Sequence, residues 1–202
     1  MQNMETYIFN NETGISDKET FDAVRKSTNK GRIIPSISKI RLCMFRPIEY
    51  LDLTVKGLEI ENLEFLQFFP DLTELYIRSG RLRDLTPLKY IPKLEKFYLM
   101  DADIDSLKPL LNFNRLDFLN LENVNVRDGD FSIMGKLKTV RHMNAYNCGI
   151  TNIEWIIAME SLETAGFDGN LIDNYSFLKG TQKLKMVSYD GDYYEAPFDD
   201  LL

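Results

Sequence analysis

Apolar residues recur in this chain with a period of about 22 residues, over roughly two-thirds of its length. Two consecutive copies show the pattern most clearly: Leu72, Leu75, Ile77, Gly80, Leu82, Leu85, Leu88 and Ile91, then Leu94, Phe97, Leu99, Ala102, Ile104, Leu107, Leu110 and Phe113. A fixed period in this range is typical of a solenoid, because one short turn cannot bury its own apolar side and must stack on its neighbours.

Each repeat contains two spacings that suit two different elements. In L-x-x-L-x-L the last apolar residues alternate, which predicts a strand, and the following I-x-x-L-x-x-L spacing suits a short helical or 3₁₀ segment. Pro87 and Pro109, one period apart, fit near the start of such a segment. The fold class predicted is therefore an α/β solenoid, a right-handed coil with a parallel concave β-sheet and short convex helices. Strands are expected at 52–56, 74–78, 96–100, 118–122, 142–146, 164–168 and 186–190, with Leu75, Ile77, Leu99, Leu121 and Phe167 buried.

The repeats divide the chain into three parts. They begin at Tyr50, Leu72, Leu94, Leu116, Val140 and Leu162, and a truncated turn follows from Leu184. Residues 50–192 thus form six full turns and a truncated seventh. Residues 1–49 are expected to be an N-terminal cap with a helix from Ser16 to about Thr28 and a strand at Lys39–Met44, and residues 193–202 a C-terminal cap. One spacing is 24 residues rather than 22, and the two extra residues fit best in the outer loop around Arg127–Asp130.

The repeats resemble those of the leucine-rich repeat family. The 22-residue period and the stretch from Asp84 to Leu94 are similar to the short class found in internalins and in phosphatase-regulating repeat proteins. The resemblance implies a backbone-bonding Asn or Cys at the ninth position of each turn. This chain has Leu58, Gly80, Ala102, Val124, Cys148, Asn170 and Asp192 there, so a continuous asparagine ladder is not expected.

Composition narrows the classes of function. The net charge is −7, and it is uneven: residues 1–100 carry 15 basic and 14 acidic residues, whereas residues 101–202 carry 9 and 17. The acidic half repels nucleic acid and attracts basic partners. No apolar run is long enough for a membrane span and the start has no signal-peptide pattern, so a cytoplasmic monomer is expected if Met1 is the native start. Cys43 and Cys148 lie too far apart along a solenoid to form a disulfide.

Motifs for catalysis or metal binding are weak. His142 is the only histidine and falls on the concave face, where we interpret it as a contact residue. Asp101–Asp105 begins like a calcium loop, but Ser106 and Asn112 stand where that loop needs Gly and Glu. Asp101, Asn123 and Asn147 stack on successive turns, which leaves a weak cation site open as an alternative to solvated turn residues. We therefore predict no enzyme activity, no metal and no cofactor.

The concave face is the strongest candidate for a binding surface. Its predicted centre is aromatic and its rim is charged, which is the composition of protein-binding hot spots, although the same aromatics are also ordinary strand formers. The candidate partner-binding residues are Tyr76, Arg78, Tyr98, Met100, Phe118, Asn120, Glu122, His142, Tyr146, Asp168 and Asp190.

The sequence thus predicts a non-catalytic protein-interaction module that binds through its concave face. A sharper hypothesis is an inhibitor or immunity-type protein that masks a basic partner. The alternative is a secreted or cell-surface adhesin or effector of the internalin type, which would need a signal upstream of Met1.

Overall fold

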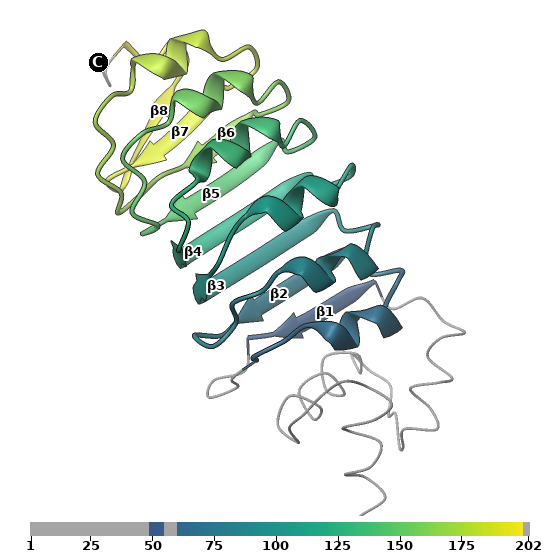
Figure 1. Cartoon of the computed structure of the whole chain (residues 1–202). Coiled ribbons are helices and arrows are strands. Elements are labelled where there is room, and N and C mark those ends of the chain that lie inside the picture. The colour runs from purple at the N-terminus through teal and green to yellow at the C-terminus, as the bar shows by residue number, and fades with distance from the viewer. Residues whose placement is uncertain (1–48, 55–59, 200–202) are drawn as a thin grey trace, which may run out of the picture.

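The computed structural model describes residues 49–54 and 60–199, and in it one sheet of eight strands extends from Tyr50 to Glu195 (Figure 1). The strands follow one another in chain order: β1 Tyr50–Leu53, β2 Glu74–Arg78, β3 Lys96–Ile104, β4 Phe118–Val126, β5 His142–Tyr146, β6 Thr164–Gly166, β7 Met186–Tyr189 and β8 Asp192–Glu195. The 3₁₀ helices in the described part alternate with them: η2 Glu64–Phe68, η3 Thr86–Tyr90, η4 Lys108–Asn112, η5 Phe131–Lys136, η6 Glu154–Ala158 and η7 Ser176–Gly180.

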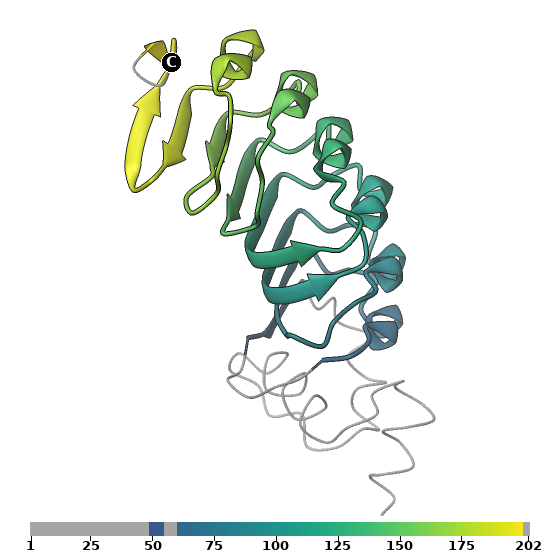
Figure 2. The ribbon, with the colours of Figure 1, turned by 60° about the vertical axis from the view of Figure 1, so that its left-hand side comes forward.

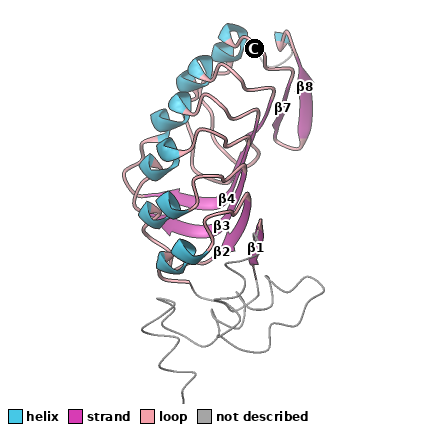
Figure 3. Cartoon of the chain, turned by 90° about the vertical axis from the view of Figure 1, so that its right-hand side faces the viewer, coloured by secondary structure: helices cyan, strands magenta, loops and turns pink. Residues whose placement is uncertain are grey.

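Strands β1 to β7 are parallel, and each is joined to the next through one 3₁₀ helix. Figure 2 shows the resulting arc, with the strands on its inner side and the helices on its outer side. Figure 3 shows the same two layers by element type. Crossovers of this kind between parallel strands of one sheet form a right-handed coil. The predicted fold class is confirmed.

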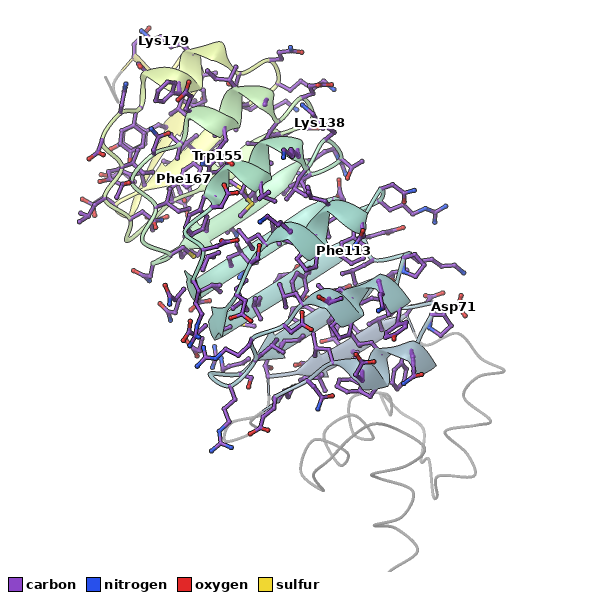
Figure 4. All side chains as sticks on the ribbon, in the orientation of Figure 1. Asp71, Phe113, Lys138, Trp155, Phe167 and Lys179 are labelled. Carbon is purple, nitrogen blue, oxygen red and sulfur yellow. The ribbon has the colours of Figure 1, made fainter. Side chains whose placement is uncertain are left out.

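One continuous hydrophobic core fills the space between the two layers. Leu75, Ile77, Leu99, Leu121 and Phe167, the residues predicted to be buried, are all fully buried. In the C-terminal turns, Trp155 of η6 meets Phe167 edge to face with ring centroids 6.2 Å apart (Figure 4). Among the described residues, no helix is both long and apolar enough to cross a membrane.

The first strand begins two residues earlier than the sequence pattern suggested. Tyr50 pairs with Glu74 and Leu53 with Ile77, so this turn is 24 residues long and the predicted strand at 52–56 was wrong. In the sequence pattern, Tyr50 takes the place of the first apolar residue of a repeat. In the structure Tyr50 is instead the first concave residue of β1, and Leu51 and Leu53 face the core.

The other long turn accommodates its extra residues in two places. Phe118 pairs with His142, which confirms the 24-residue spacing between β4 and β5. One extra residue lies in the loop before η5, close to the predicted position, and the other lengthens η5 itself to six residues. Gly129, with φ of 63°, permits the tight turn that leads to Asp130. The Asp130 side chain then accepts a hydrogen bond from the Ser132 amide and caps η5.

A short polar ladder holds two successive turns together inside the coil. The buried Asn170 side chain accepts hydrogen bonds from the Cys148 and Ile150 amides and donates to the carbonyls of Ala145 and Phe167. Cys148 occupies the equivalent place one turn earlier, where its thiol lies 3.3 Å from the Tyr146 carbonyl oxygen and 3.7 Å from the Leu121 carbonyl oxygen. Burial raises the pKa of Cys148 to about 11, so this thiol stays protonated at neutral pH.

We expect Asn170→Ala to lower the free energy of unfolding by about 1–3 kcal/mol, because it leaves buried backbone groups without partners. Asn170→Cys is the matched variant, since Cys148 already performs this role in the chain, and it is expected to cost less. Urea denaturation of both variants measures the difference. Equal losses would mean that a thiol at this position does not replace the hydrogen bonds of the amide.

Where the ninth position is apolar, strand pairing replaces the side-chain ladder. Ala102 and Val124 occupy that position in β3 and β4, and both strands continue past it to Ile104 and Val126. The predicted strands ended at residues 100 and 122. Asp101 and Asn123 adopt positive φ of 51° and 53° at the point where the pairing is interrupted.

The sheet ends in an antiparallel strand that the repeat pattern does not contain. Strand β8 pairs with β7 through the two-residue turn Asp190–Gly191, in which both residues have positive φ. Phe198 then packs into the core after β8. The predicted N-terminal cap, with its helix, its strand and Cys43, lies outside the described residues.

Candidate functional site

The concave face consists of the strand residues that alternate with the core positions. The parallel register aligns them in rows, of which the central one contains Asp52, Tyr76, Tyr98, Asn120, Asn144, Gly166 and Ser188. The strands therefore place most of the predicted binding residues on one open surface.

Five ring-bearing residues follow one another in a row of ring contacts across this surface, which we call the aromatic ladder: Tyr50, Tyr76, Tyr98, Phe118 and His142. The two central contacts are stacked and the two outer ones are tilted. Tyr76 and Tyr98 are stacked with centroids 4.0 Å apart and an interplanar angle of 8°. Phe118 continues the stack at 5.0 Å from Tyr98, and His142 follows at 6.4 Å. All five side chains are half-buried, so the ladder is held by the sheet and remains accessible from the concave side.

Carboxylates fix the hydroxyl ends of the first two rungs. The Tyr76 hydroxyl donates to Glu74 Oε1 at 2.5 Å, and the Tyr50 hydroxyl donates to Asp52 Oδ2 at 3.3 Å. Burial, together with the neighbouring carboxylate, raises the pKa of both tyrosines above their usual value. Since a raised pKa favours the neutral phenol, these hydrogen bonds persist through the neutral and mildly alkaline range.

Tyr146 does not belong to the ladder, although the sequence grouped it with Tyr76, Tyr98 and Phe118. It lies in a different row, opposite Glu122, and its ring leans across Gly166. A Cβ atom at residue 166 would come within 2.6 Å of the Tyr146 ring. The glycine therefore lets this tyrosine lie against the sheet.

Polar side chains continue the surface beyond the ladder. Asn144 donates to the Asn120 side-chain oxygen at 3.2 Å, and Asn120 is buried. His142 Nδ1 lies 2.9 Å from the Thr164 hydroxyl. These contacts hold His142 beside Phe118 on the concave face.

Basic residues near the N-terminal end of the concave face are engaged in ion pairs. Arg78 Nε lies 3.1 Å from Asp101 Oδ2, and its guanidinium also contacts the Met100 sulfur at 3.6 Å. Lys96 Nζ lies 3.5 Å from Glu74 Oε2. Both positive charges have an acidic neighbour, which largely neutralises them.

The C-terminal half of the same face, from β4 onward, has acidic residues without such partners. Within the described part of the chain, no ion pair involves the members of this group, which we call the acidic end: Glu122, Asp168, Asp190 and Glu195. Asp168 also has a structural role, because it accepts hydrogen bonds from the Ser188 hydroxyl at 2.7 Å and the Gly191 amide at 2.6 Å.

The acidic turn residues on the flank bind to other side chains. The Asn123 amide donates to Asp101 Oδ1 at 2.9 Å. Asp103 accepts two hydrogen bonds from Arg127, each of 3.0 Å, and these hold its pKa well below the usual range. No group of acidic, histidine or cysteine residues suited to a metal ion occurs in the part of the chain that the structure describes. The positive φ at Asp101, Asn123 and Asn147 accounts for short polar residues at these turns.

A groove of about 490 Å³ lies on the flank between the turns of β4 and β5. It opens there because β4 pairs with β3 as far as Val126, whereas its pairing with β5 ends at Glu122 and Tyr146. Phe131, Ile150 and Trp155 form its apolar wall. His142 is not among the lining residues, so the groove is separate from the concave surface.

Comparisons with known proteins place the chain by its fold. No family model matches the sequence, and no curated protein matches it. Among solved structures, an internalin (inlF) from Listeria monocytogenes has a TM-score of 0.62 at 16% identity, covering 87% of this chain and 56% of its own. Internalin C2 from the same organism has a TM-score of 0.56 at 19% identity, over 86% of this chain and 93% of its own.

A leucine-rich repeat protein from Leptospira interrogans is also similar, with a TM-score of 0.53 at 19% identity. The match covers 66% of this chain and 36% of the other. The chain therefore spans only about half the length of the first of these internalins and about a third of the Leptospira protein. The fold of the protein is the leucine-rich repeat solenoid seen in the internalins.

Proposed function

We propose that the protein binds another protein through its concave face, with the aromatic ladder as the anchor and the acidic end as the charged rim. The observation that carries this proposal is the continuous row of five half-buried rings on an open sheet. Large aromatic residues supply contact area at little cost in side-chain entropy, and they dominate the energetics of protein interfaces. The internalin-like fold supports an interaction role without catalysis.

The stacking also bears on what the partner presents. Both faces of the Tyr98 ring are covered, by Tyr76 and by Phe118, so a partner meets ring edges and the tyrosine hydroxyl. Ring edges carry the positive part of the quadrupole, and they favour aromatic faces, carbonyl oxygens and apolar side chains over cations. We therefore expect an apolar or aromatic anchor on the partner, and basic residues only where it faces the acidic end.

An inhibitor or immunity-type protein that masks a basic partner fits this division of the surface. The adhesin or effector role remains the alternative, and it differs by requiring a partner outside the cell that makes the protein. Affinity capture on the immobilised protein identifies the partner for the measurements that follow.

Removing charge from the acidic end is expected to slow association without weakening the anchor. We predict that Glu122→Gln combined with Asp190→Asn lowers the association rate several-fold at low salt, and that the difference fades as salt screens the charges. Surface plasmon resonance at two ionic strengths measures this effect. Asp168 is left unchanged because its carboxylate holds Ser188 and Gly191.

The matched control removes the same charge from the convex face. Glu64→Gln combined with Glu154→Gln changes two exposed residues in the first turns of η2 and η6. Its association rate should match that of the unmodified protein. An equal slowing in both double variants would show that net charge alone attracts the partner, and would contradict a steering role for the acidic end.

A further inference from the structure

The last strand of the sheet has an outer edge that is open among the described residues. Figures 2 and 3 both show β8 as the outermost strand of the sheet, with β7 on its one paired side. An open strand edge offers backbone donors and acceptors to another chain, and natural proteins usually cover or charge it.

The hydrogen-bond pattern shows which backbone groups this edge presents. In antiparallel pairs, residues opposite each other alternate between bonded and non-bonded. The Ala196 amide donates to the Lys185 carbonyl, so Tyr194 and Asp192 also bond to β7. Tyr193 and Glu195 then direct their N–H and C=O groups outward. The Glu195 carbonyl accepts from the Phe198 amide, which leaves the Tyr193 N–H, the Tyr193 C=O and the Glu195 N–H without partners in the described structure.

The side chains beside these groups lie on the concave face. Tyr193 is opposite Ser188 and Glu195 is opposite Met186, so both extend the concave surface. Tyr193 is 73% exposed, and no described ring stacks on it, in contrast to Tyr98. Its ring faces are therefore open to a cation, which an aromatic ring binds over its face.

Charge determines which kind of strand fits this edge. Asp190, Asp192 and Glu195 flank it, and within the described part of the chain none of them is in an ion pair. Pairing with a second copy of this chain would bring two such sets of carboxylates together, and like charges across neighbouring strands are destabilising. A strand with alternating basic residues would meet the carboxylates and the open face of Tyr193.

We propose that the outer edge of β8 is a docking site for an extended basic segment of another protein, which adds a strand to the sheet. Backbone hydrogen bonds to Tyr193 and Glu195 would hold the segment, and its basic side chains would lie against Glu195 and the Tyr193 ring on the concave side. This site is separate from the aromatic ladder and does not require it.

The test uses a short synthetic peptide of alternating lysine and valine as the probe, added to the full chain. Hydrogen exchange followed by NMR should show that the Tyr193 and Glu195 amides become protected when the peptide binds. Two control peptides separate the contribution of charge from that of backbone pairing. One carries N-methyl groups on alternate amides, so that it keeps its charge but cannot pair, and the other replaces valine with glycine to weaken strand formation.

Two variants of one residue test the backbone contact directly. Tyr193→Pro removes the outward N–H at a position where an edge strand tolerates proline, whereas Tyr193→Thr keeps the N–H and removes the ring. We expect peptide binding to weaken at least roughly tenfold in the proline variant and only a few-fold in the threonine variant. Circular dichroism and urea unfolding confirm that each variant is folded.

Several results would overturn the proposal. Equal binding of the N-methylated peptide to the unmodified protein would show that charge alone attracts the probe, and this measurement holds even if Tyr193→Pro fails to fold. Equal affinity of the proline and threonine variants would exclude backbone pairing at Tyr193. Protection of both amides in the free protein, with a dimer in sedimentation, would assign the edge to a second copy. Peptide binding at β8 does not depend on the aromatic ladder, so ladder variants that lose the partner of the concave face should still bind the peptide.

Discussion

Leu99→Ala is expected to lower the free energy of unfolding by roughly 2–5 kcal/mol, because it opens a cavity in the middle of the coil. Leu99 is fully buried in β3, and its strand neighbours in register, Ile77 and Leu121, are fully buried as well. Because turns on both sides hold these neighbours in place, the surrounding side chains cannot move to fill the cavity that the change creates.

The matched variant is Leu184→Ala, which removes the same atoms near the end of the coil. Leu184 is 6% exposed, and it lies in the last turn, where fewer neighbours constrain the site. A smaller loss is expected there. Chemical denaturation of the full chain gives both values, and an equal or reversed order would contradict the nearest-neighbour account of the core.

Phe118→Ala is expected to weaken partner binding by at least about 2 kcal/mol, a factor of roughly thirty, mainly through faster dissociation. Phe118 links Tyr98 to His142 in the aromatic ladder, and it is only half-buried in the protein alone. Its loss removes contact area and leaves the Tyr98 ring stacked on one face only. Surface plasmon resonance with the captured partner measures the dissociation rate.

Leu111→Ala is the control for a non-specific loss of apolar surface. Leu111 is 40% exposed on η4, on the opposite face of the solenoid. The Leu111→Ala variant should bind the partner with the affinity of the unmodified protein. The concave-face account would fail if Phe118→Ala kept full affinity while Leu111→Ala lost it, provided that both variants unfold at the same urea concentration as the unmodified protein.

Most of the coil could be predicted from the sequence because its period records packing in every turn. Leu99 and Leu121 occupy the same position in successive repeats, and both face the core. Each further repeat with an apolar residue at this position strengthens the prediction that the position is buried. The error in the first turn has a local cause. Tyr50 resembles an apolar first residue by type, and only the pairing with Glu74 shows that it faces the concave side.

The candidate surface was predicted in outline and not in its contacts. Alternation identified Tyr76, Tyr98 and Phe118, but stacking depends on side-chain directions and on neighbouring turns, which a one-dimensional pattern does not contain. The sequence pattern also could not show that Tyr146 lies apart from the ladder. Its ring leans across residue 166, which is possible only because that residue is a glycine without a side chain. The hydrogen bonds of Asp168 to Ser188 and Gly191 also join residues about one turn apart.

The β8 hairpin was missed although the sequence contains a signal for it. Asp190–Gly191 is a preferred pair for a two-residue hairpin turn, and strand-forming residues flank it on both sides. The interpretation of residues 184–192 as a truncated parallel turn concealed this hairpin. Where the repeat is interrupted, a pair such as Asp190–Gly191 therefore indicates a hairpin turn rather than a further parallel strand.

Site-specific photo-crosslinking tests the concave-face claim most directly. A benzoylphenylalanine side chain at Met100, on the same side of β3 as Tyr98, leaves the ladder intact, and the same group at Leu111 reports on the convex face. We predict that the partner is crosslinked from position 100 and not from position 111. Crosslinking from position 111 alone would contradict the account.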